Sequence, residues 1–182
     1  MPEDPQPKAK VHPFRSGGRG AIARPRTDAA YAELHVTSNF TFLTGASHPD
    51  ELVSTAAALG HRAIALTDRN TLAGIVRAHI AAKGAGIPFL VGSRVCLSEP
   101  VGGDGASVLV YPTDRASYGR LCRLLTLGKR RGAKGECPLT LADLIEHNEG
   151  LLGVLVPPKR LDEAFARRLR TLRGVFGDDR LS

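Results

Sequence analysis

The sequence has few of the features that mark membrane, secreted or disulfide-rich proteins. Aromatic residues make up 5% of its 182 residues, and no apolar run approaches the roughly 20 residues that span a bilayer. The first thirty residues lack the continuous apolar stretch of a secretory signal. Three widely spaced cysteines, Cys96, Cys122 and Cys137, form no C-x-x-C pair, which argues against a disulfide framework and a zinc ribbon. We therefore expect a globular, cytoplasmic protein with no membrane partner.

Basic residues are in excess, with 25 Lys and Arg against 18 Asp and Glu and a formal charge of +7. This balance favours polyanions and makes nucleic acid the first partner to test. The alternative is that a composition rich in Arg and Ala tracks a GC-rich coding sequence. Residues 1–29 mix Pro, Lys, Arg and Gly without periodicity, which predicts a disordered basic tail. Residues 30–182 are expected to form the folded part.

Two apolar segments, 32–38 and 63–70, each end in polar residues. Residues 48–60 lie between them and predict a helix, with Ser47 as the N-cap, Pro49 early in the first turn and Gly60 at the end. The pattern is that of a strand-helix-strand unit. Since parallel strands of such a unit end on the same rim, we expect His35 and Asp68 to lie on one edge of the sheet.

The alternation of strands and helices continues along the chain. We predict a helix over 72–83, a strand over 87–92 ending at Ser93 and Arg94, a strand over 107–111 and a helix over 115–127. A helix over 141–147, a strand over 150–156 and a helix over 161–172 follow. The order is typical of an α/β fold with parallel strands and outer helices. The predicted inward stripe of the 115–127 helix is Leu121, Cys122, Leu124 and Leu125.

The rim residues are the beginning of a metal site built from nitrogen and oxygen ligands. Two dependable ligands, His35 and Asp68, are too few for a tight divalent site, and structural hydrogen bonding is the alternative role for both. Spacing alone therefore predicts a barrel-like or layered α/β domain with a vestigial site. A second candidate site is the glycine-flanked segment 128–135, read as a basic loop. Its cations, Lys129, Arg130, Arg131 and Lys134, are candidates for weak, sequence-blind DNA contact.

Five stretches carry a resemblance to a known family. They are AELHVTSNFTFLTGASHPDELV, LGHRAIALTDRNTLAGIVRAH, AGIPFLVGSRV, YGRLCRLLTLGKRRGAKGECPL and EGLLGVLVPP, and together they cover most of residues 31–158. In this order they resemble the polymerase and histidinol phosphatase (PHP) domain at the amino terminus of bacterial C-family DNA polymerases. The likeness is greatest to error-prone relatives of the polymerase III alpha subunit. The resemblance implies a (β/α) barrel, here incomplete, placed before the polymerase module.

The resemblance also implies where metal ligands would be. Metal-competent members carry H-x-H at the first strand, T-D-H at the second and G-x-E at the third. His35 and Asp68 match, whereas Thr37, Arg69 and Arg94 replace the other ligands at those motifs. Two guanidinium groups at a cation site would repel a metal. We therefore expect no metal or other cofactor in this chain and no catalytic residue of its own, and we expect Arg69 or Arg94 to pair with Asp68.

By resemblance, the chain is the PHP part of an error-prone polymerase that serves DNA repair and damage-tolerant synthesis, itself structural and truncated before the barrel is complete. The implied partners are the rest of the polymerase, DNA and, through the full-length protein, the sliding clamp and mutagenesis accessory proteins. Magnesium is implied for the full-length family. One alternative is a metal-dependent phosphoesterase using His35 and Asp68. Another is a free-standing nucleic-acid-binding module, against which stands the lack of aromatic residues interleaved with the 129–134 cations.

Overall fold

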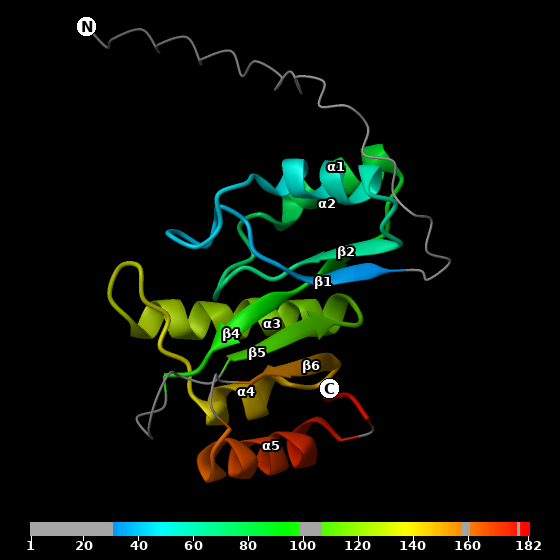
Figure 1. Cartoon of the computed structure of the whole chain (residues 1–182). Coiled ribbons are helices and arrows are strands. Elements are labelled where there is room, and N and C mark those ends of the chain that lie inside the picture. The colour runs from blue at the N-terminus through cyan, green and yellow to red at the C-terminus, as the bar shows by residue number, and fades with distance from the viewer. Residues whose placement is uncertain (1–30, 99–106, 158–160, 178) are drawn as a thin grey trace, which may run out of the picture.

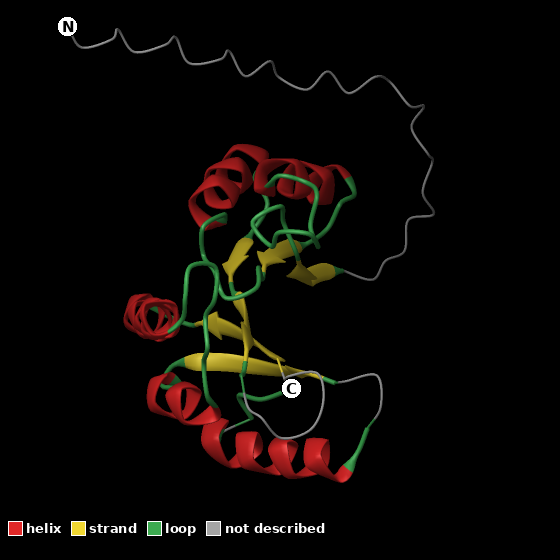
Figure 2. Ribbon diagram, turned by 90° about the vertical axis from the view of Figure 1, so that its left-hand side faces the viewer, coloured by secondary structure: helices red, strands yellow, loops and turns green. Residues whose placement is uncertain are grey.

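Two three-stranded sheets, each covered by its own helices, make up the fold (Figures 1 and 2). The computed structural model describes residues 31–98, 107–157, 161–177 and 179–182. The predicted disordered tail, residues 1–29, lies outside the described residues. No helix in the described ranges is long and apolar enough to cross a membrane.

The first half is parallel, as the sequence predicts. Its strands are β1 (Ala32–Val36), β2 (Ala63–Leu66) and β3 (Phe89–Val91), in the order β1-β2-β3. Its helices are α1 (Pro49–Ala58) and α2 (Ile75–Ala85), which lie together over one face of the sheet (Figure 1). The N-cap of α1 is His48 rather than Ser47, and the His48 amide donates to Glu51 Oε2 at 2.8 Å. Gly86 ends α2 in the left-handed conformation, with φ at 68°, which glycine adopts at little cost.

Burial of β2 on both faces explains its continuous apolar sequence. Ile64 and Leu66 pack with α1 and α2, whereas Ala65 packs against Leu109 and Tyr111 of the second sheet. Successive residues of a strand point to opposite faces, so all four β2 residues are buried. The strand thus lies between the two halves of the molecule.

The second half is antiparallel, so the prediction of parallel strands throughout is wrong. Its strands are β4 (Ser93–Cys96), β5 (Ser107–Pro112) and β6 (Leu151–Val156), in the order β4-β5-β6, and both pairs are antiparallel. Its helices are α3 (Arg115–Arg131), α4 (Leu141–His147) and α5 (Glu163–Phe176). Two helices, α3 and α4, connect β5 to β6, as predicted. The chain therefore returns to the end of β5 that it left, and Leu151 pairs with Pro112.

Gly92 alone separates β3 from β4 and so joins the two sheets. A Cβ there would lie 2.9 Å from both Thr67 Cγ2 and the Tyr111 ring, closer than van der Waals contact allows. Only glycine lets the chain pass between these side chains. The Tyr111 hydroxyl also donates to the Leu34 carbonyl at 2.6 Å, which ties β5 to β1. Burial raises the pKa of Tyr111 to about 12.

The antiparallel half holds the larger core. The predicted stripe of α3 is confirmed for Leu121, Leu124 and Leu125, which pack with Leu172 and Phe176 of α5. Cys122 is half-buried and lies outside this core. Residues 180–182 run along β6, where Leu155 donates its amide to the Ser182 carbonyl at 2.9 Å. The described strands form two open sheets, so the predicted barrel is not confirmed.

Candidate functional site: the strand rim and its groove

Asp68 lies at the end of β2, as predicted, and is the most deeply buried charged side chain of the rim, at 2% exposure. Its Oδ1 accepts hydrogen bonds from the Ser38 amide at 2.8 Å and from Thr41 Oγ1 at 2.7 Å. Its Oδ2 accepts from Ser38 Oγ at 2.6 Å. Three short bonds to the segment after β1 compensate the carboxylate for its burial.

The expected pairing of Asp68 with Arg69 or Arg94 is wrong. No ion pair joins Asp68 to either guanidinium among the described residues. The two arginines instead form a β-bridge through their main chains, and the Arg94 amide donates to the Asp68 carbonyl at 3.1 Å. Arg94 Nε donates to Ser107 Oγ at 2.9 Å. Hydroxyl donors satisfy a buried carboxylate without the cost of desolvating a guanidinium.

His35 and Thr37 complete the predicted set on β1 and just after it. His35 is exposed on the strand, and its pKa lies below the usual range because neighbouring atoms desolvate the ring and Arg94 repels its charged form. Thr37 is half-buried. The strand ends bring His35, Asp68 and Arg94 to one rim, but Ser38 and Thr41 are the residues that hold Asp68. Their signal in the sequence was the group of hydroxyl residues Thr37, Ser38 and Thr41 within five positions after the first strand.

These residues do not fit the metal that metal-competent members of such a fold carry. Both Asp68 oxygens are occupied by protein donors, and guanidinium groups stand at two ligand positions. Within the described residues no group of three or more His, Cys, Asp or Glu side chains is arranged to hold a metal ion. The Asp68 carboxylate is thus engaged by protein donors, and two arginines bring positive charge to the same rim.

A large groove opens beside the rim, with a volume of about 1220 Å³. Thr37, Arg69 and Arg94 line one part of it, and Lys129 and Lys134 line another. The groove exceeds the roughly 300–1,000 Å³ usual for small-molecule pockets. Its side chains are positively charged and hydroxyl-rich, a chemistry that suits phosphate groups.

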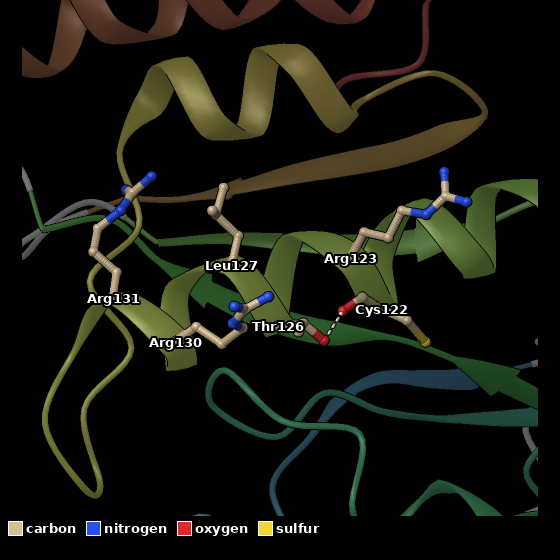
Figure 3. Close-up of a pocket in the computed structure, with 6 residues that line it drawn as sticks. All are labelled: Cys122, Arg123, Thr126, Leu127, Arg130 and Arg131. Carbon is tan, nitrogen blue, oxygen red and sulfur yellow. Dashed lines mark hydrogen bonds between the residues drawn. The ribbon is translucent and has the colours of Figure 1, made fainter.

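Residues 128–131 of the basic segment belong to helix α3, which corrects its prediction as a loop for that part, whereas residues 132–135 lie outside the helix as predicted. Helix α3 continues through Gly128 to Arg131. Gly128 does not end the helix; it lets the side chains of Cys137 and Leu139 pack closely against the helix backbone. Lys129 and Lys134 face the groove, whereas Arg130 lines a different pocket of about 540 Å³ with Arg123 and Thr126. Figure 3 shows Arg130 and Arg131 leaving the end of α3 in different directions.

Arg131 has a structural partner. Its guanidinium binds both oxygens of Asp143, at 2.6 and 3.0 Å. The hydrogen bond from Arg131, with help from Thr140, holds the pKa of Asp143 well below its usual range. This bidentate pair joins α3 to the start of α4, so Arg131 is less available to a ligand than its three neighbours.

Comparison with known proteins defines the class first. Residues 33–169 match the PHP domain family, and the chain belongs to that family. Error-prone DNA polymerases are among its curated relatives. The protein of that name from Caulobacter vibrioides is 53% identical over 145 residues, or 79% of this chain. The protein from Allorhizobium ampelinum is 53% identical over 148 residues, or 81% of the chain. The chain spans 13% of the length of each.

Solved structures support the fold alone. A structure titled as a putative metal-dependent phosphoesterase from Bifidobacterium adolescentis has a TM-score of 0.59 at 14% identity, over 79% of this chain and 74% of that one. An amidohydrolase from Chromobacterium violaceum, titled with bound SO4 and no metal, has a TM-score of 0.52 at 20% identity. It covers 81% of this chain and 75% of that one. The PHP assignment made from the sequence is confirmed by the family match over residues 33–169 and by the relatives at 53% identity.

Proposed function

We propose that this chain serves as the PHP domain of an error-prone DNA polymerase in damage-tolerant DNA synthesis and repair. The observation that carries the proposal is the 53% identity to proteins of that name over about four fifths of the chain. The polymerase module would lie in the part of those relatives that this chain does not span. Magnesium would serve that module, and the setting would be the cytoplasm.

The role of the domain itself is structural rather than catalytic. Asp68 serves as an internal acceptor that fixes the chain after β1, and Arg69 and Arg94 replace acidic or histidine ligands. Such a rim braces its own loops instead of activating water. Further strands of the family pattern would complete a barrel around the parallel sheet. The phosphoesterase alternative, in which His35 and Asp68 hold a metal, is disfavoured by the same contacts.

The remaining partners are DNA and, through the full-length protein, the sliding clamp and mutagenesis accessory proteins. For DNA, the exposed cations Lys129, Arg130 and Lys134 are the proposed contacts. Arg131 is the weakest of the four original candidates, since Asp143 binds it.

A domain exchange tests the role. Residues 31–182 would replace the matching segment of the Caulobacter vibrioides relative, and primer extension would be measured on templates with and without an abasic site. We expect synthesis at the parental rate, in the chimera and in its Asp68→Asn variant, because no step runs through Asp68. A folded chimera that loses synthesis, or an Asp68→Asn variant that is stable but inactive, contradicts the proposal.

A metal titration tests the proposal that the rim holds no metal ion. We expect no micromolar binding of Mn²⁺ to the chain by calorimetry, because the rim repels cations. Stoichiometric binding that disappears in the Asp68→Asn variant would place a metal on the rim and restore the phosphoesterase alternative.

A further inference from the structure

The groove beside the rim collects positive charge from both halves of the molecule. Arg69 follows β2 and Arg94 lies at the start of β4, whereas Lys129 and Lys134 come from the end of α3 and the segment after it. Glu136 is the only carboxylate among the lining residues, and its Oε2 accepts from the Ala133 amide at 3.1 Å. Four cations against one carboxylate leave the groove strongly positive.

Aromatic side chains line the same groove. Phe40 and Phe42, from the segment between β1 and α1, are among its lining residues, and Phe42 is 84% exposed. In the sequence these rings stand almost ninety residues from Lys129, which is why the basic segment alone shows no interleaved aromatic residue. The fold brings aromatic and cationic side chains to one groove.

Phe42 is exposed on a firmly held segment. Its neighbour Thr41 bonds to Asp68, and the Thr44 and Gly45 amides both donate to the Thr41 carbonyl, at 3.1 and 3.0 Å. A Cβ at Gly45 would lie 2.0 Å from the Ser38 carbonyl oxygen, so the turn closes only with glycine. A pre-positioned, solvent-exposed ring loses little conformational entropy on contact with a planar ligand.

We propose that this groove binds single-stranded nucleic acid, with Phe42 stacking on an unpaired base and Arg69, Arg94, Lys129 and Lys134 contacting the phosphates. Exposed rings beside cations are the usual means of binding single strands without reading sequence. Bases in a duplex are already stacked and offer no free face to Phe42. Thr37, Thr44 and Thr71, which also line the groove, provide hydroxyl donors for phosphate oxygens.

The first test compares two neighbouring side chains on the same loop. Leu43 is exposed, as Phe42 is, but does not line the groove. Fluorescence anisotropy with a labelled oligothymidine is expected to show a loss of about tenfold or more for Phe42→Ala and none for Leu43→Ala. If Phe42→Ala and Leu43→Ala bind the oligonucleotide with equal affinity, Phe42 does not stack on a base.

A second test reports on stacking directly. The chain contains no Trp, so Phe42→Trp and Leu43→Trp each introduce a single fluorophore. The oligonucleotide is expected to quench the emission of Phe42→Trp and to leave that of Leu43→Trp unchanged. Binding that quenches neither variant overturns the proposal even where the alanine variants fail to fold.

The charge contribution is tested by salt. Removing one groove cation, by Lys134→Gln or Lys129→Gln, should make the slope of log K against log salt less negative by about 0.7. Lys83→Gln, which removes an exposed cation at the end of α2 that lines neither pocket, is the matched control and should leave the slope unchanged. Equal slopes in groove and control variants, or a duplex bound as tightly as the single strand, would refute the assignment. The isolated chain is used throughout, so this outcome is independent of the domain exchange.

Discussion

The two halves of the molecule are built from side chains of different size. In the parallel half, small residues such as Ala56, Ala78 and Ala82 bring α1 and α2 close to each other and to the sheet. In the antiparallel half, leucines of α3 and α4 pack with Leu172 and Phe176 of α5. Since large buried side chains remove more apolar surface from water, the antiparallel half contributes more to stability. The parallel half instead carries the buried polar network around Asp68.

Because the two cores differ in side-chain size, a cavity should lower the free energy of unfolding by different amounts in the two halves. The cavity in the antiparallel half is the largest effect that we expect. Leu124→Ala, at a fully buried site of α3, should destabilise the protein by about 2–5 kcal/mol. Val53→Ala in α1 removes fewer buried groups and should cost about 2 kcal/mol. Urea unfolding followed by circular dichroism measures both, with the exposed Leu161→Ala as a control near zero. A larger loss for Val53→Ala would reverse the comparison.

In the parallel half, stability depends on the hydrogen bonds that Asp68 accepts. Asp68→Ala leaves the Ser38 amide, Ser38 Oγ and Thr41 Oγ1 without their acceptor, and we expect a loss of about 3 kcal/mol. Asp68→Asn keeps an acceptor oxygen and should lose less than half as much. Hydrogen exchange is expected to show faster exchange at the Ser38 and Thr41 amides in Asp68→Ala only. Protection that persists there would mean that Asp68 does not hold this segment.

The antiparallel half has a corresponding charged contact, the Arg131–Asp143 pair. Because the pKa of Asp143 is lowered in the folded state, its contribution is complete above the ordinary pKa of Asp and is lost as the pH falls below about 4. We expect Asp143→Asn to cost about 2 kcal/mol at pH 7 and progressively less on acidification.

Unfolding in urea over a pH series measures this difference. Asp50→Asn, which removes the exposed pair with Arg77, is the matched control and should cost less than about 0.5 kcal/mol at any pH. A difference between parent and Asp143→Asn that stays constant down to pH 3 would contradict the pairing.

The smallest expected effect concerns the contact between the halves. Tyr111→Phe removes the bond from the Tyr111 hydroxyl to the Leu34 carbonyl and should cost about 1 kcal/mol. The remaining ring still packs on Ala65, so the two halves should unfold together in one transition. Two transitions in the variant, with one in the parent, would show that this single bond joins the halves cooperatively.

The sequence alone determined the strands and helices, the shared rim and the family, because local features encode them. Caps, glycines and apolar periodicity mark the elements, and His35 and Asp68 fall at strand ends in motifs of the PHP family. The direction of the strands in the second half is set by tertiary packing and not by these local features. Both helices between β5 and β6 were predicted, but their order along the chain does not fix the direction of the strand that follows. Only the packing of α3 with α4 returns β6 antiparallel to β5.

Only the tertiary structure decided which side chains meet. Asp68 has Arg69 as its neighbour in the chain, yet Ser38 and Thr41 are the residues that bind its carboxylate. Short hydroxyl side chains satisfy a buried acceptor at lower desolvation cost than a guanidinium does. Likewise, the sequence separated the basic segment from any aromatic residue. The groove that places Phe42 beside Lys129 and Lys134 exists because two halves, each predictable in its elements, fold against each other.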